Sequence, residues 1–165
     1  MKRAGIFLFF DPQGLVDDYI VECLTSLREY LDEILVVSNS PLDDTARERL
    51  LKGATEVFER ENTGFDVGGY RDGSARFGWD RLGQIDELIL FNYTFFAPVN
   101  PWKNLFDRVD AAGAVDFWGI TEHDAVRPHP FLAASRMPRH IQSHWIAVRN
   151  PLLSSPHFRK YWDEM

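Results

Sequence analysis

Short apolar runs alternate along this chain with segments whose apolar residues recur at helical spacing. The first run, Ala4–Phe10, is apolar throughout and has the length of a strand, which is typical of a sheet covered on both faces. In the segment that follows, apolar residues recur every three or four positions, as on the buried side of a helix: Val16, Ile20, Cys23, Leu24, Leu27 and Leu31. The pattern therefore predicts a buried strand followed by an amphipathic helix.

The same alternation continues to the end of the chain. It predicts further strands at Ile34–Ser38, Thr55–Glu59, Leu88–Asn92, Phe117–Ile120 and Ser143–Val148. Helices are expected at Leu42–Lys52, from a glycine-rich segment towards Trp79, and from Pro101 to about Ala112. Residues 122–138 lack periodicity, and residues 151–162 mix loop and helix signals. Repeated strand–helix units predict one α/β domain over residues 1–165, with a mostly parallel central sheet and helices on both faces.

In sheets of this kind, ligands bind beyond the carboxyl ends of the strands. The segments that follow the predicted strands are therefore the candidates for a binding crevice. They are residues 10–11, 38–39, 59–69, 92–94 and 120–124.

The segment Glu61–Gly73 holds four glycines in thirteen residues. Its glycines Gly64, Gly68 and Gly69 permit backbone angles and close approaches that a β-carbon forbids. We expect Asp66 to cap the helix that follows and Arg71 to lie in its first turn. Free N–H groups beside an arginine suit a diphosphate, although an ordinary strand-to-helix loop explains the same glycines. The spacing matches neither G-x-G-x-x-G nor G-x-x-x-x-G-K-[ST], which disfavours a Rossmann dehydrogenase and a P-loop NTPase.

Two groups of titratable residues follow later in the chain. Glu122, His123 and Asp124 cluster at a predicted strand end, where a carboxylate can act as a general base and where a solvated loop is the simpler interpretation. His140 and His144 are four residues apart, similar to a zinc-ligand pair. Ile141 in place of glutamate and the adjacent strand signal argue against a zinc protease, so the alternative is hydrogen bonding in a pocket or core.

The composition limits the partners and the cellular environment that are expected for the protein. Eighteen Lys and Arg against 25 Asp and Glu give a net charge of −7, which disfavours nucleic-acid binding. The lone cysteine, Cys23, cannot form an internal disulfide, which favours a reducing, cytoplasmic environment. The first apolar run stops at Asp11 with no cleavage site, so a buried strand is expected rather than a secretion signal. No apolar segment approaches the roughly 20 residues that span a bilayer, so no transmembrane segment is expected.

Four strings, taken in order, resemble the rhamnan synthesis protein F family of polysaccharide-building proteins. They are Glu61–Arg71, Glu87–Asn92 with Phe95–Pro98, Asp116–Glu122 and His140–Ser143, and the likeness extends over about residues 4–162. The resemblance implies a Rossmann-like fold of the glycosyltransferase A type, which binds a nucleotide-diphospho-sugar. The family pattern continues past Met165, so the chain is expected to be a fragment or a short version.

The resemblance also implies a set of site residues. A broader similarity to family-two-type glycosyltransferases implies that Asn39, Asn62, Gly64 and Arg71 contact the nucleotide or its phosphates. The remaining substrate-binding candidates are Asp11, Asp66, Gly68, Gly69, Asn92, Tyr93, His140 and His144. Asp124 or Glu122 is expected to be the catalytic base that takes the acceptor proton.

The implied function is transfer of a sugar, for example from dTDP-rhamnose, to a glycan or lipid-linked glycan in cell-surface polysaccharide or lipopolysaccharide synthesis. A lipid-linked acceptor would bring the protein to the inner face of the membrane. Such enzymes carry an acidic residue after the fourth strand that anchors Mg²⁺ or Mn²⁺ under the diphosphate, and here Tyr93 stands in that place. The rival hypothesis, favoured by Tyr93, is a non-catalytic module of the same fold that binds a glycan, a nucleotide or a protein partner. A flavodoxin-like or receiver-type domain fits the alternation but not the glycine-rich segment.

Overall fold

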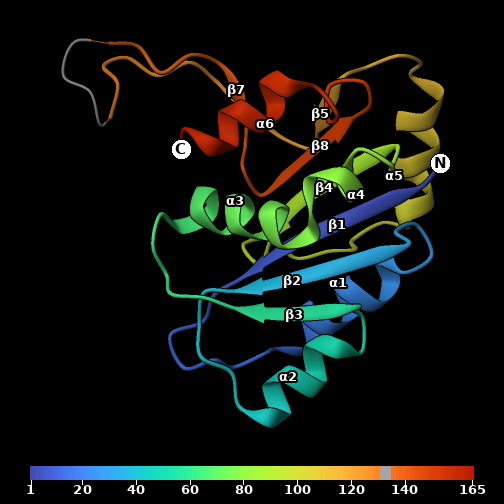
Figure 1. The fold of residues 1–165 in the computed structure, drawn as a ribbon, viewed down its shortest axis with the longest axis vertical. Coiled ribbons are helices and arrows are strands. Elements are labelled where there is room, and N and C mark those ends of the chain that lie inside the picture. The colour runs from blue at the N-terminus through green and yellow to red at the C-terminus, as the bar shows by residue number, and fades with distance from the viewer. Residues whose placement is uncertain (131–134) are drawn as a thin grey trace.

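The computed structural model describes residues 1–130 and 135–165. Its centre is a six-stranded sheet with the strand order β3-β2-β1-β4-β8-β5 (Figure 1). The strands are β1 (Arg3–Phe9), β2 (Glu33–Ser38), β3 (Glu56–Glu59), β4 (Glu87–Asn92), β5 (Phe117–Gly119) and β8 (Trp145–Arg149). Neighbours among β1–β4 pair in parallel, whereas β8 runs antiparallel to both β4 and β5. The ends of β1–β5 and the start of β8 therefore share one edge of the sheet, here called the carboxyl edge.

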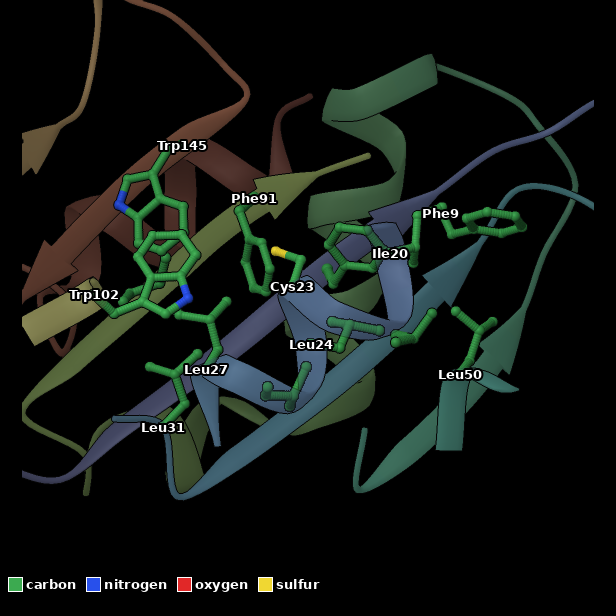
Figure 2. Close-up of a cluster of buried hydrophobic side chains, with 14 of the residues drawn as sticks. Phe9, Ile20, Cys23, Leu24, Leu27, Leu31, Leu50, Phe91, Trp102 and Trp145 are labelled. Atoms are coloured by element: carbon green, nitrogen blue, oxygen red, sulfur yellow. The ribbon is translucent and has the colours of Figure 1, made fainter. Parts of the chain in front are cut away.

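Helices cover both faces of this sheet, as predicted. One face carries α1 (Asp18–Leu27), α2 (Asp44–Leu51) and α5 (Trp102–Ala111), whose apolar side chains join one buried cluster. Figure 2 shows Ile20, Cys23 and Leu24 of α1 directed at the sheet within this cluster. The other face carries α3 (Phe65–Phe77), α4 (Trp79–Leu82) and α6 (Pro156–Asp163), which surround a second cluster.

The central position of β1 explains why its residues from Ala4 to Phe9 are all apolar. Successive side chains of a strand point to opposite faces. Phe7 and Phe9 thus enter the cluster under α1, while Ile6 and Leu8 enter the cluster under α3. All four are buried, so neither face of the strand tolerates polar residues.

A buried cluster of charges lies at the opposite edge of the sheet. Glu87, the first residue of β4, has a fully buried side chain that accepts hydrogen bonds from three donors. They are Arg3 Nε at 2.7 Å, Trp118 Nε1 at 2.8 Å and Arg149 Nε at 2.5 Å. Both arginines also pair with Asp110, which balances the second positive charge. Each buried charge therefore has a partner, as burial requires.

Several predicted elements have different bounds or partners. The helix expected from Val16 to Leu31 is confined to α1, and Leu31 is buried beyond its end. The helix from the glycine-rich segment ends at Phe77, where Gly78 adopts a φ of +93°, before the short α4. The last strand is β8, displaced two residues from its predicted start at Ser143.

The prediction that residues 122–138 are irregular is wrong in part. β6 (Glu122–His123) pairs antiparallel with β7 (His140–Ile141), and a further bridge joins Val126 to Met137. This β6–β7 ribbon has no sequence signal because its strands are too short to show alternation. Residues 131–134 of the same segment lie outside the described part of the chain.

Candidate functional site

The glycine-rich segment delivers the start of α3 to the carboxyl edge. Gly64 precedes the helix with a φ of +71°, a left-handed conformation that glycine adopts without strain. Among the described residues no side chain caps α3, so its first N–H groups are available to a ligand. The expectation that Asp66 caps the helix is wrong, because its carboxylate is turned to Asn92 and Ser143 instead.

Arg60, which the sequence interpretation missed, organises the loop before α3. Its side chain is only 6% exposed and donates in three directions. Nε reaches Asp72 at 2.7 Å, Nη1 reaches Asn39 Oδ1 at 2.7 Å, and Nη2 reaches the Thr63 carbonyl at 2.7 Å. One guanidinium therefore ties the end of β2, the loop after β3 and the second turn of α3 together.

Two predicted nucleotide contacts, Asn39 and Asn62, lie together in this network. Asn39 Nδ2 donates to Asn62 Oδ1 at 2.9 Å, while Asn39 itself is 5% exposed. Since its own backbone N–H donates to the Phe9 carbonyl at 2.8 Å, Asn39 is fixed on the ends of β1 and β2. Asn62 remains exposed, so it is the member of the pair that a ligand can reach.

Gly68 and Gly69 are required for close packing of α3. A Cβ on Gly68 would lie 2.2 Å from the Thr63 carbonyl oxygen, and one on Gly69 would lie 2.3 Å from Leu8 Cδ1. Gly68 thus lets the preceding loop pack against α3, and Gly69 lets α3 pack against β1. The ordinary structural role of these glycines thus accounts for them, whether or not a ligand also approaches.

Arg71 borders a small pocket at the start of α3. The pocket has a volume of about 190 Å³ and is lined by Thr63, Gly64, Val67, Gly68, Arg71 and Met165. Arg71 Nε donates to Asp72 Oδ1 at 2.9 Å, and the arginine side chain is 42% exposed. Partial burial raises the pKa of Asp72, but hydrogen bonds from Arg71 and Arg60 outweigh it and the pKa is lowered. The group beside the pocket is therefore a carboxylate held between two arginines.

The end of β4 is joined to α3 and to the segment before β8. Asn92 is 2% exposed and donates from Nδ2 to Asp66 Oδ2 at 2.9 Å. Ser143 Oγ donates to the same oxygen at 3.1 Å, and the Tyr70 hydroxyl donates to the Ser143 carbonyl at 2.9 Å. Ser143 appeared in the sequence only as part of the family-like string His140–Ser143 and of a predicted strand, and not as a site residue, since its partners lie more than 70 positions away.

Asp11 and Tyr93 border a second pocket of about 220 Å³ at the carboxyl edge. Asp11 Oδ1 accepts the N–H groups of Gln13 at 2.9 Å and Leu15 at 3.0 Å, which shapes the loop after β1. The Tyr19 hydroxyl donates to the Tyr93 carbonyl at 3.0 Å. Burial raises the pKa of Tyr93, and the nearby carboxylates of Asp66 and Asp11 raise it further, so its phenol stays protonated.

The structure separates the two histidines that the sequence placed four residues apart. The His144 carbonyl accepts the Asn92 N–H at 3.3 Å, so His144 lies at the end of β4. Its Nε2 is 2.9 Å from Thr121 Oγ1, and burial lowers the pKa of the ring. His140 instead lies on β7, where its ring stacks on His123. Only His144 joins the cluster around Asn92.

The candidate bases lie on the β6–β7 ribbon. Glu122 forms an ion pair with Arg139, and the exposed Asp124 accepts at its backbone carbonyl from His123 Nδ1 at 2.7 Å. Within the described residues, no hydrogen bond or ion pair joins either carboxylate to α3 or to β4. The ribbon leaves the body of the molecule on the side where β2 and β3 end, at the left of Figure 1.

The carboxyl edge offers few protein ligands for the expected Mg²⁺ or Mn²⁺. Across residues 1–130 and 135–165, no three His, Cys, Asp or Glu side chains gather closely enough to hold an ion. Asp11 and Asp66 are the carboxylates nearest Tyr93, and both already accept internal hydrogen bonds. The described protein groups therefore do not form a metal site by themselves, and we derive no step through a metal.

No helix in the described part of the chain is both long and apolar enough to cross a bilayer.

Three solved structures share this fold. A 4-diphosphocytidyl-2C-methyl-D-erythritol synthase aligns with a TM-score of 0.55 and 17% identity, over 99% of this chain and 85% of that chain. The synthase from Anaerococcus prevotii aligns with a TM-score of 0.57 and 15% identity, over 98% of this chain and 76% of that chain. HddC from Yersinia pseudotuberculosis aligns with a TM-score of 0.54 and 13% identity, over 96% of this chain and 82% of that chain. At these identities the likeness establishes the fold, and the predicted Rossmann-like α/β class is confirmed.

Sequence relatives carry the comparison further. The uncharacterized protein y4gN of Sinorhizobium fredii is 26% identical over 160 residues, which make up 96% of this chain and 39% of that protein. The chain thus spans about two fifths of the length of this curated relative. Residues 34–165, from β2 to the last residue, match the family described as rhamnan synthesis protein F. Since that match covers most of the chain, the protein belongs to the rhamnan synthesis protein F family.

Proposed function

We propose that this domain binds a nucleotide-diphospho-sugar, such as dTDP-rhamnose, and takes part in transfer of the sugar to a glycan during cell-surface polysaccharide synthesis. One observation carries the proposal: the uncapped start of α3, beside Arg71, opens into a pocket at the carboxyl edge. A helix N-terminus carries partial positive charge and free N–H donors, which suit a diphosphate. Family membership supports a substrate used in polysaccharide assembly.

Different residues of the site bind the diphosphate, the nucleoside and the sugar of such a donor. The N–H groups after Gly64 and the Arg71 guanidinium bind the diphosphate. Asn62, which Arg60 and Asn39 fix in place, contacts the nucleoside. The exposed Ser143 hydroxyl, which Asp66 orients, then lies at the sugar and binds a polar substituent, while the buried Asn92 amide holds Asp66 in place.

Transfer breaks the bond from the anomeric carbon to the diphosphate oxygen as the acceptor oxygen bonds to that carbon. The electron pair of the broken bond leaves on the diphosphate, whose growing charge is stabilised by Arg71 and the start of α3. The acceptor proton goes to a carboxylate, for which we retain Asp124 or Glu122. The acceptor in this scheme is a glycan or a lipid-linked glycan, the latter met at the cytoplasmic face of the membrane.

Calorimetric titration with dTDP, UDP and GDP tests the donor site, each with and without Mg²⁺ or Mn²⁺. We expect one diphosphate to bind, and Arg71→Gln to weaken it by about 10–100-fold, the worth of a charge-assisted hydrogen bond. Arg76→Gln is the matched control and leaves affinity unchanged, because Arg76 is on the same helix, does not line the pocket and pairs with Glu56. If no diphosphate binds the folded protein, or if Arg71→Gln binds as tightly, the assignment is wrong. Enhancement by metal would support the Mg²⁺ or Mn²⁺ prediction.

A second candidate is a non-catalytic module that binds nucleotide or glycan without turnover. It is favoured by Tyr93 at the end of β4 and by the ion pair that occupies Glu122. Asp124→Asn and Glu122→Gln discriminate the two. Under the transferase hypothesis at least one abolishes transfer while nucleotide binding persists. Nucleotide binding without any measurable transfer by the unaltered chain would instead support the binding module.

A further inference from the structure

His123 and His140 form a pair that neither the proposed donor site nor the buried cores use. They lie directly opposite each other on β6 and β7, one on each strand of the ribbon. Their rings stack almost parallel, with centroids 5.4 Å apart and an interplanar angle of 13°. The sequence suggested a pair of His140 with His144, whereas the fold pairs His140 with a residue seventeen positions earlier.

The hydrogen bonds of both rings fix the same tautomer. His123 Nδ1 is 2.7 Å from the Asp124 carbonyl, and His140 Nδ1 is 2.8 Å from the Pro138 carbonyl. A carbonyl oxygen can only accept, so each Nδ1 carries the proton and each Nε2 keeps a lone pair. Metal-ligating histidines show this arrangement, with one ring nitrogen donating to a carbonyl and the other binding the ion.

The two lone pairs face the same way. Asp124 and Pro138 both lie on the tip side of the histidine pair, so both Nδ1 atoms point towards the tip of the ribbon. Because the rings are nearly parallel, their Nε2 lone pairs are directed along nearly parallel lines. A tetrahedral Zn²⁺ with bonds of 2.0–2.1 Å needs its two nitrogens about 3.3 Å apart, so both imidazoles must rotate about their Cβ–Cγ bonds for the lone pairs to converge on one ion.

Neighbouring charges lie on the other face of the ribbon. Adjacent residues of a strand point to opposite faces, so Glu122 and Arg139 project away from the histidines and pair with each other. No third protein ligand is required by this arrangement, because water or a ligand completes the coordination of an open zinc site.

We propose that His123 and His140 bind a transition-metal ion such as Zn²⁺ through their Nε2 atoms and thereby cross-link β6 to β7. Imidazole nitrogen suits Zn²⁺, Cu²⁺ and Ni²⁺, whereas Mg²⁺ and Ca²⁺ prefer oxygen. The site is therefore chemically distinct from the Mg²⁺ or Mn²⁺ predicted for the donor diphosphate. It lies at the base of the ribbon that carries Glu122 and Asp124, so bound metal stiffens the segment that holds the candidate bases.

The test is a calorimetric titration of the untagged protein with Zn²⁺ in the absence of nucleotide. We expect one ion per chain, unaffected by excess Mg²⁺. His123→Ala and His140→Ala should each weaken Zn²⁺ binding by about tenfold or more. The remaining single imidazole binds the ion without a second ligand held nearby at high effective concentration. His157→Ala, an exposed histidine of α6, is the matched control and retains binding.

Nitrogen NMR of the histidine rings supplies a readout that does not depend on the variants. Zn²⁺ should shift the Nε2 signals of His123 and His140 while their Nδ1 signals remain those of protonated nitrogens. Absence of Zn²⁺ binding, unchanged binding in the double alanine variant, or coordination through Nδ1 would each overturn the proposal. Because no nucleotide is present, these results are independent of the diphosphate titration.

Discussion

Replacing Arg60 by alanine tests whether one buried guanidinium holds the loop of the candidate site. The Arg60 side chain is 6% exposed and donates to Asp72, Asn39 and Thr63. The cost of the substitution depends on what each acceptor finds once the guanidinium is gone. The three acceptors differ in exposure and in their remaining partners, so their contributions are unequal.

Asn39 contributes most of the expected loss. This residue is 5% exposed, and a buried acceptor without a donor costs about 1–3 kcal/mol. Asp72 keeps the hydrogen bond from Arg71 and has a side chain that is 29% exposed, so solvent screening limits its loss to about 1 kcal/mol. The exposed Thr63 carbonyl turns to water. The sum is about 3 kcal/mol, which for a domain of this size lowers Tm by roughly 6–12 °C.

Urea denaturation followed by circular dichroism measures this loss. The matched control is Arg76→Ala, whose side chain is 55% exposed and pairs at 2.7 Å with Glu56, itself 43% exposed. An exposed ion pair of this kind contributes about 1 kcal/mol or less. Arg60→Lys should fall between the two, because an ammonium keeps the charge but lacks the planar fork that reaches three acceptors. If Arg60→Ala costs no more than Arg76→Ala, the guanidinium does not hold the loop and the account of this site is wrong.

Three further predictions concern packing and charge elsewhere. Glu87→Gln should destabilise the protein by about 3–5 kcal/mol in urea denaturation, because it leaves two buried arginines with only the partly exposed Asp110 as their anion, and a loss under about 1 kcal/mol would contradict this. Gly68→Ala places a Cβ 2.2 Å from the backbone oxygen of Thr63 and should cost about 1–3 kcal/mol. Gly83→Ala, whose nearest atoms are 3.6 Å away, should cost little, and equal losses would refute the close-approach argument. Burial lowers the pKa of His144 below its usual 6.5, so just below that pH the unfolded chain binds more protons than the folded one. Stability should then fall as pH drops, and His144→Gln should reduce the difference between unfolding free energies measured at about pH 5.5 and 7.5.

The sequence predicted the elements whose signal is local. β1 is apolar from Ala4 to Phe9 because both faces of a central strand are covered, and the buried apolar residues of α1 recur at helical spacing. The glycine-rich segment identified the turn into α3 for a similar reason. Gly64 has a positive φ, and Gly68 allows the helix to approach the preceding loop. Each of these features depends on residues within a few positions of one another.

Residues of the candidate site were predicted unevenly. Asn39 and Asn62 followed from strand ends and resemblance, and the structure places them in contact. Arg60 had no distinguishing signal, because an arginine after a strand is ordinary until its partners 12 and 21 positions away are known. Asp66 was expected to cap α3, but Asn92 and Ser143 provide donors from other elements and draw the carboxylate to them.

The position of β8 shows that the fold, too, was predicted only in part from the sequence. Its apolar sequence predicted a strand, but not that it enters between β4 and β5 and runs antiparallel to both. The pairing of His123 with His140 likewise depends on two strands that are too short to be recognised alone. Sequence by itself determined the α/β class, the order of most elements and the glycine-rich turn, because hydrophobic periodicity and backbone freedom act over a few residues. Only the tertiary structure decided strand order, the Arg60 network and the histidine pair, because these depend on contacts between segments that the chain brings together from far apart.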